Sequence, residues 1–213
     1  MGQVRSWAGL DVHVSGTAAA CCDAVSGELR VARLTGGIEP ALAWCRALPG
    51  PVRVSYEAGA TGFGLARALA AEDGIECVVC APGLIPRAPR DRVKTDRRDA
   101  ERLVRLLMAG ELVAVRVPTA AEEGLRDLVR AREDVRIDLT RARQRLGKQL
   151  LRHGERFEDA RANWTQRHLD WLARIELEDA AAQAACCDYL DAVRSLMVRR
   201  ERLEREIAAL IAT

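Results

Sequence analysis

Four acidic residues stand where a carboxylate can take part in chemistry. Asp11 lies near the end of the first predicted strand, and Glu57 ends a later one. Asp96 and Asp99 open a predicted helix, and their spacing of three places them on one helix face. Because strand ends and helix starts meet at one edge of an α/β sheet, we expect these four carboxylates to form one cluster.

A cluster of this kind indicates a metal site. Carboxylates that lie close together repel one another unless a cation neutralises their charge. Oxygen ligands completed by water suit Mg²⁺ or Mn²⁺. Two such ions steady the attacking and the leaving oxygen in phosphodiester chemistry. We therefore interpret the four acids as metal ligands and as catalytic residues.

Each acid also has an ordinary structural role open to it. Asp11 would then only end a strand, and Glu57 would bond the backbone amides of the loop that follows it. Asp96 would be the N-cap of its helix, with Asp99 as the capping-box partner. The sequence leaves both interpretations open for each residue taken singly.

The elements that must position these acids alternate between strands and helices. Apolar alternation and turn signals predict five strands, at 4–13, 17–25, 29–35, 52–57 and 75–81. Helical spacing predicts three helices, at 39–48, 63–72 and 96–110. The first three strands are joined by tight turns, whereas the later ones are joined through helices. This order predicts an α/β domain over 1–115, with a mixed sheet and flanking helices.

In the remainder, residues 116–213, the apolar residues follow a different spacing. Apolar residues follow heptad spacing in two runs, the first being Leu125, Leu128, Val135, Leu139, Ala142 and Leu146, and the second Tyr189, Val193, Leu196, Leu203, Ile207 and Leu210. Arg132 and Arg200 interrupt these runs, and a shorter helical segment at about 164–186 separates them. The pattern predicts an antiparallel α-helical coiled coil.

The two apolar seams predict a homodimer, because one thin hairpin does not fully cover them. We expect Leu139→Asp to weaken such a dimer. In the competing interpretation the chain is a monomer whose segment 164–186 folds over both seams.

Basic residues gather in the middle of the chain. The net charge is only +2, from 33 Lys and Arg against 31 Asp and Glu, but residues 87–160 hold 19 basic residues against 14 acids. Two groups are predicted to bind nucleic acid: Arg87, Arg90, Arg92, Lys94, Arg97 and Arg98 beside the acids, and a helical stripe of Arg141, Arg145, Lys148 and Arg152. The alternatives are a loop that aids solubility and a solvated helix face.

Composition narrows the function classes further. Aromatic residues make up only 4% of the chain, which argues against a carbohydrate-stacking module and against an aromatic platform for single strands. Seven cysteines without a visible secretion signal indicate reduced thiols and a cytoplasmic protein. Cys77 and Cys80 sit in an apolar run and are expected to pack as small hydrophobes rather than to bind zinc. No apolar stretch is long enough to span a membrane.

Three motifs that carry the acids resemble one family. They are GLDVH at 9–13, YEAGATG at 56–62 and, most specifically, KTDRRDA at 94–100. They resemble the DEDD-type insertion-sequence transposases, guide-RNA-directed recombinases with a RuvC-like N-terminal domain followed by a coiled coil. The resemblance implies a ribonuclease-H-like fold, DNA as substrate, a guide RNA as partner and action at the nucleoid. It also implies that Mg²⁺ binds at Asp11, Glu57, Asp96 and Asp99.

The family pattern includes one part that this sequence does not match. Family members carry a further C-terminal domain with a serine nucleophile and form the active site from both domains. None of the serines present, Ser6, Ser15, Ser26, Ser55 and Ser195, stands in a matching setting. We therefore expect a truncated form: the metal-binding, nucleic-acid-handling half of a DNA transposase, with its own recombination activity in doubt.

Three other functions compete with this interpretation. The first is a catalytically inactive remnant that binds nucleic acid or joins full-length subunits. An actin-like ATPase is disfavoured, because its first strand continues as Asp-x-Gly-Thr and here Asp11 is followed by Val-His-Val. A RuvC-type junction resolvase fits the acids but not the heptad runs.

Overall fold

The computed structural model describes residues 3–86, 95–159 and 163–212. The chain divides into two compact units, Met1–Ala120 and Ala121–Thr213, a few residues beyond the boundary expected after residue 115. Four of the predicted nucleic-acid ligands, Arg87, Arg90, Arg92 and Lys94, lie outside the described residues.

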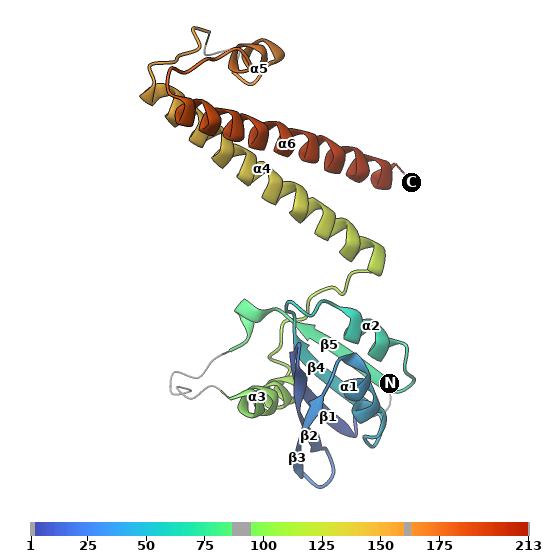
Figure 1. Cartoon of the computed structure of the whole chain (residues 1–213). Coiled ribbons are helices and arrows are strands. Elements are labelled where there is room, and N and C mark those ends of the chain that lie inside the picture. The colour runs from blue at the N-terminus through green and yellow to red at the C-terminus, as the bar shows by residue number, and fades with distance from the viewer. Residues whose placement is uncertain (1–2, 87–94, 160–162, 213) are drawn as a thin grey trace. The chain divides into compact units, whose positions relative to one another are not determined.

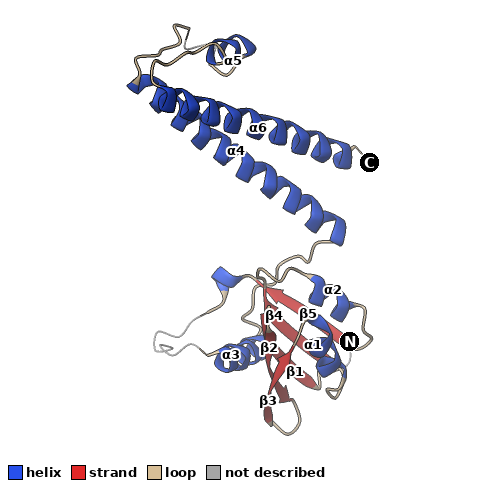
Figure 2. Cartoon of the chain, viewed as in Figure 1, coloured by secondary structure: helices blue, strands red, loops and turns tan. Residues whose placement is uncertain are grey.

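The first unit is built on a five-stranded mixed sheet (Figures 1 and 2). Its strands are β1 (Ser6–His13), β2 (Gly16–Asp23), β3 (Leu29–Thr35), β4 (Val52–Glu57) and β5 (Ile75–Cys80). They lie in the order β3-β2-β1-β4-β5. The first three pair antiparallel, and β4 and β5 run parallel to β1. The predicted α/β class with a mixed sheet is therefore confirmed.

Helices cover both faces of this sheet (Figure 2). On one face lie α1 (Ile38–Arg46) and α2 (Gly64–Ala70), and on the other lies α3 (Asp96–Ala109); a short 3₁₀ turn, η1 (Pro82–Leu84), follows β5. The larger core lies beneath α1 and α2 and includes Leu10, Val54, Tyr56, Leu42 and Leu69. Since neighbouring residues of a strand point to opposite faces, the residues that follow Leu10 and Tyr56 point towards the α3 face.

Close contact between α3 and β1 depends on Gly9. A Cβ atom at this position would lie 2.4 Å from the carbonyl oxygen of Ala100 and 2.9 Å from the Cβ of Leu103. Any side chain would therefore push the helix away from the strand. Asp11 follows two residues later on the same face, so this contact also sets the distance between Asp11 and the start of α3.

The second unit is a helical hairpin in which α4 (Ala120–Arg152) and α6 (Ala180–Ile211) lie side by side, with α5 (Gln166–Leu172) at the connecting end (Figure 1). Side chains of the heptad runs meet inside it, and buried members include Val135, Leu139, Ala142, Leu146 and Val193. The hairpin is antiparallel, because Arg132 binds Glu204 and Gln149 binds the carbonyl oxygen of Ala182. The coiled-coil geometry itself stays a prediction.

The predicted helical segment at about 164–186 is wrong in its extent. Helix α5 ends at Leu172, and α6 begins at Ala180. The Asp179 side chain accepts a hydrogen bond from the backbone N–H of Ala182 and caps the new helix. Leu172 packs with Leu146 of α4, so this segment covers the loop end of the hairpin rather than its whole length.

Arg132, which interrupts the first heptad run, has a partner across the hairpin. Its guanidinium lies 3.0 Å from a carboxylate oxygen of Glu204. Gln149 is buried and donates to the carbonyl oxygen of Ala182 at 2.8 Å. These two contacts lie towards opposite ends of the hairpin and fix the register of α4 against α6.

None of the described helices combines the length and the hydrophobicity needed to cross a membrane.

Replacing Gly9 by Ala tests the close contact between β1 and α3. We expect the change to destabilise the first unit by about 1–3 kcal/mol, because the new methyl group has no room against the backbone of Ala100. Chemical denaturation followed by circular dichroism measures this. Gly83→Ala is the matched control, since among the described residues beyond its chain neighbours no atom lies within 4 Å of the position that a Cβ would take. Equal stability of the two variants would contradict the packing argument.

Candidate metal centre

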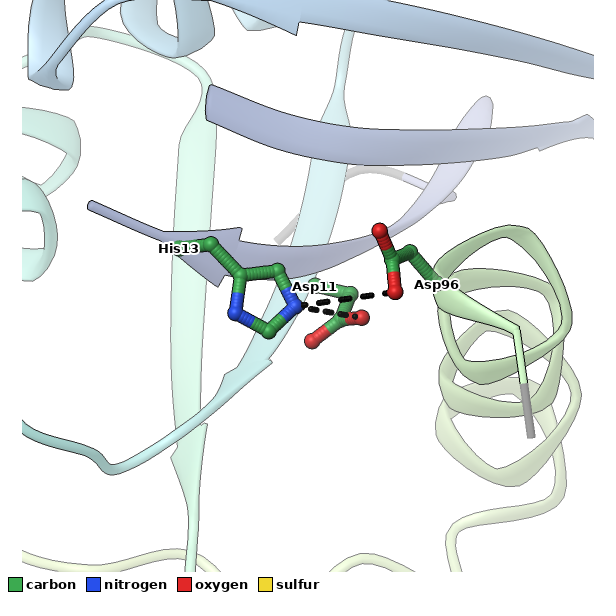
Figure 3. Close-up of side chains that lie close together, drawn as sticks. All are labelled: Asp11, His13 and Asp96. Atoms are coloured by element: carbon green, nitrogen blue, oxygen red, sulfur yellow. Dashed lines mark hydrogen bonds and ion pairs between the residues drawn. The ribbon is translucent and has the colours of Figure 1, made fainter. Parts of the chain in front are cut away.

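Three side chains converge at the edge of the sheet next to the start of α3 (Figure 3). They are Asp11 and His13 of β1 and Asp96 of α3, and one potential ligand atom from each lies within 4.8 Å of the other two. Nε2 of His13 is 3.1 Å from Oδ2 of Asp11 and 3.9 Å from Oδ1 of Asp96. Residues far apart in the sequence thus present two carboxylates and an imidazole to one point.

Local structure explains how each ligand reaches this point. Asp11 and His13 are two residues apart on a strand and so point to the same face. The side chain of Thr95 accepts a hydrogen bond from the N–H of Arg98 and caps α3. The suggestion that Asp96 is the N-cap is therefore wrong. Asp96 is the first residue inside the helix, and its carboxylate is left to face the site.

Asp99 lies close to this group but has a partner of its own. Its Oδ1 is 2.8 Å from the guanidinium of Arg102, one turn further along α3. The other oxygen, Oδ2, is buried and has no hydrogen-bond partner among the described residues. A buried carboxylate oxygen without a donor is costly unless a cation or a water molecule satisfies it.

Glu57 stands at the same edge of the sheet but apart from the group. The register of β1 and β4 pairs Leu10 with Tyr56, so Asp11 and Glu57 come next on neighbouring parallel strands and point to the α3 face. Within the described part of the chain, Glu57 is not among the ligands that converge within 4.8 Å. The structure thus brings Asp11 and Asp96 together, with Asp99 nearby and Glu57 further off.

The electrostatics of the site favour a cation. Burial raises the pKa of the Asp11 carboxyl, and the charges of Asp99 and Asp96 raise it further, whereas His13 opposes the rise. The carboxylates therefore repel one another, and a bound cation would relieve that repulsion. The two carboxylates suit Mg²⁺ or Mn²⁺, and the imidazole is a better ligand for a transition metal such as Mn²⁺ than for Mg²⁺. The residues present thus fit a divalent metal ion.

His13 was not among the sequence-predicted ligands. The predicted ligands were all acidic residues at strand ends and helix starts, whereas His13 is a histidine two residues after Asp11 in the same motif. Its position could have been inferred from the sequence, because His13 is two residues after Asp11 and therefore lies on the same face of the strand. At 52% exposure the imidazole is accessible at the mouth of the site.

The predicted nucleic-acid ligands that the structure describes fall into two places. Arg97 and Arg98 lie in the first turn of α3, directly after Asp96, and Arg97 forms an ion pair with Glu101 at 2.8 Å. The stripe on α4 is exposed to solvent at all four of its positions, Arg141, Arg145, Lys148 and Arg152. Arg141 lies 3.6 Å from Asp138, whereas no ion pair is found for the other three among the described residues.

The chain is similar to known transposases. A family profile described as transposase, of the DEDD type named after IS110, matches residues 8–154. A putative transposase, y4qE, of Sinorhizobium fredii is 40% identical over 98% of this chain and 54% of its own length. The transposase of insertion sequence element IS1533 from Leptospira borgpetersenii is 38% identical over 72% of this chain and 43% of its own length. The chain spans about half the length of these curated relatives.

The matched region contains Asp11, His13, Glu57, Asp96 and Asp99. It includes the five-stranded sheet from Ala8 of β1 onwards and all of α3, and a mixed sheet of this kind fits a ribonuclease-H-like transposase domain. The resemblance seen in the three sequence motifs is therefore confirmed, and the chain belongs to the IS110-type family of DEDD transposases.

Proposed function

We propose that this chain forms the metal-binding, DNA-handling part of a transposase. The observation that carries the proposal is the convergence of Asp11 and Asp96 with His13, in a chain of a transposase family. When bound at these residues, Mg²⁺ or Mn²⁺ would polarise a phosphodiester oxygen and lower the pKa of a water ligand. The substrate in this proposal is DNA, and a guide RNA is the partner.

The residues around the site have separate roles in this proposal. Asp11, His13 and Asp96 hold the metal ion. Arg102 orients Asp99 so that its free oxygen, Oδ2, is available for a second ligand contact. Glu57 approaches from the neighbouring strand when a second ion or the substrate is present.

The cations next to the site have the chemistry to hold a phosphate backbone. Arg97 and Arg98 follow Asp96 in the first turn of α3, where the helix N-terminus also favours an anion. A strand held there would place a phosphodiester beside the carboxylates. Arg87, Arg90, Arg92 and Lys94, which lie outside the described residues, are proposed to add phosphate contacts.

A homodimer through the helical hairpin completes the proposal. Leu139 is buried between α4 and α6 within one chain, so Leu139→Asp would damage the hairpin itself and does not test a dimer. Towards the open end of the hairpin, exposed apolar side chains include Val129, Leu210 and Ile211. A second copy that covers them would remove this apolar surface from water.

Metal binding at Asp11 is testable by calorimetry. Asp11→Asn should reduce Mn²⁺ affinity at least tenfold, because it removes one of the converging charges. In EDTA the same variant should be at least as stable as the parent, since the fold raises the pKa of this carboxyl and therefore disfavours its ionised form at neutral pH. Asp73→Asn changes an exposed acid in the same unit and is the control. Equal Mn²⁺ binding by all three proteins would contradict the site.

Strand cleavage tests the function itself. In Mn²⁺, the parent chain should nick DNA, and Asp96→Asn should abolish nicking while leaving DNA binding intact. The reason is that Asp96 belongs to the metal cluster, whereas the proposed DNA contacts lie on cations beside it. Gel assays of cleavage and of binding separate the two effects. Metal-dependent DNA binding without any nicking by the parent would favour the inactive-remnant alternative.

The dimer is testable by light scattering at micromolar concentration. Leu210→Glu should shift the mass towards that of a monomer, because Leu210 is 57% exposed and lies at the open end of the hairpin. Val14→Glu, an exposed apolar position in the first unit, should leave the mass unchanged. A parent mass near 23.4 kDa at all concentrations would eliminate the dimer.

A further inference from the structure

A hollow lies beside the candidate metal centre, on the side of β2 and β3 rather than of β4. Its volume is about 230 Å³. The residues that line it include His13 and Asp96, which belong to the group drawn in Figure 3. They also include Arg33 of β3, which was not among the sequence-predicted ligands of nucleic acid. The hollow thus connects the metal centre with a cation two strands away.

The register of the sheet explains why this space is open. Asp11 pairs with Ala18, and Ala18 pairs with Arg33, so these residues form one row across three neighbouring strands. Directly paired residues point to the same face, which places Arg33 on the face of Asp11. Between them β2 presents only Ala18 and, in the next row, Gly16. Neither has a side chain larger than a methyl group, so nothing from β2 fills the hollow.

Arg33 is available to a ligand from solvent. It is exposed, and its guanidinium forms no ion pair or hydrogen bond within the described part of the chain. Its neighbours on the same face of β3, Val31 and Thr35, are also exposed and carry no charge. The other arginine of this strand, Arg30, is by contrast bound to Glu28 at 2.8 Å. Arg33 is therefore a cation at the rim of the hollow without a partner of its own among the described residues.

The two sides of the hollow carry opposite charge. Asp96 lines one side, with Asp11 next to it, and Arg33 stands on the other. An anion that entered alone would be attracted by Arg33 and repelled by the carboxylates. A divalent cation held by the carboxylates would turn that repulsion into attraction. With the metal ion bound, the hollow would have positive charge on both sides, which suits a phosphate.

We propose that Arg33 binds a phosphate of the DNA strand in this hollow, next to the phosphodiester at the metal ion. The proposal rests on the proposed function and adds a substrate contact to it. A guanidinium donates two parallel N–H bonds to two oxygens of one phosphate. Arg97 and Arg98 lie on the α3 side of the metal centre, whereas Arg33 lies on the β3 side. The strand would be held on both sides of the bond to be cleaved.

Arg33→Ala tests this contact, and Arg30→Ala is the matched control. Both variants remove one positive charge from β3, but the odd spacing of three places Arg30 on the opposite face of the strand. The exposed ion pair that Arg30 forms with Glu28 contributes little to stability. Binding of a short fluorescein-labelled DNA duplex is followed by anisotropy at several salt concentrations, in Mn²⁺ and in EDTA. Circular dichroism checks that both variants fold.

In Mn²⁺, we expect Arg33→Ala to weaken DNA binding about tenfold and to reduce the slope of log affinity against log salt by about one. Arg30→Ala should leave both close to the parent. In EDTA the two variants should bind alike, because the carboxylates then keep phosphate out of the hollow. Arg33→Lys should restore the salt slope but not the full affinity, since an ammonium does not bind two phosphate oxygens side by side. Calorimetry should show unchanged Mn²⁺ binding by Arg33→Ala.

Equal DNA binding by Arg33→Ala and Arg30→Ala in Mn²⁺ would overturn this proposal. An equal loss in Mn²⁺ and in EDTA would also overturn it, because the contact would then lie away from the metal ion. An RNA duplex of the same sequence is the second arm, and a loss seen with RNA alone would overturn the assignment to DNA.

Each of these three results leaves the proposed function standing, because that is judged by Mn²⁺ binding with Asp11→Asn and by nicking with Asp96→Asn. A parent chain that binds no Mn²⁺, or no DNA, would overturn both proposals.

Discussion

The contact between α3 and β1 at Gly9 is the constraint on which the candidate metal centre depends. A side chain at position 9 would collide with the backbone of Ala100. The helix can lie this close to the strand only because Gly9 has a hydrogen atom in place of a side chain. The same contact places the first turn of α3 beside the end of β1. Asp11 and Asp96 are far apart in the sequence. They meet because the backbones of β1 and α3 approach each other closely at Gly9.

This closeness has an electrostatic cost that the fold partly offsets. Asp11 is disfavoured as an anion by burial and by its acidic neighbours, and His13 lies within 3.1 Å of its oxygen. The guanidinium of Arg102 forms an ion pair with Asp99 in the same way. Two basic side chains thus stand beside two carboxylates before any cation arrives. A metal ion bound at the proposed site would have to share or displace these contacts, so its affinity would depend on His13 and Arg102 as well as on the acids.

Much of the first unit was predictable because its elements are marked by local patterns. Apolar patterns and turn signals predicted all five strands to within two residues at each end, and the predicted start of α3 at Asp96 is the observed one. His13 was missed because its role depends on which face of β1 meets α3, and that is a tertiary property. The break between Leu172 and Ala180 was missed because the residues between them include good helix formers, and the cap at Asp179 decides where α6 begins.

The two contacts that hold α4 and α6 in register make the hairpin a rod of defined length. Helix α6 has 32 residues, and at 1.5 Å per residue it spans about 48 Å. Sliding by one turn would separate Arg132 from Glu204 and leave buried Gln149 without the carbonyl of Ala182. The hairpin is therefore a rigid element, and its register sets the distance between its connecting end and its open end.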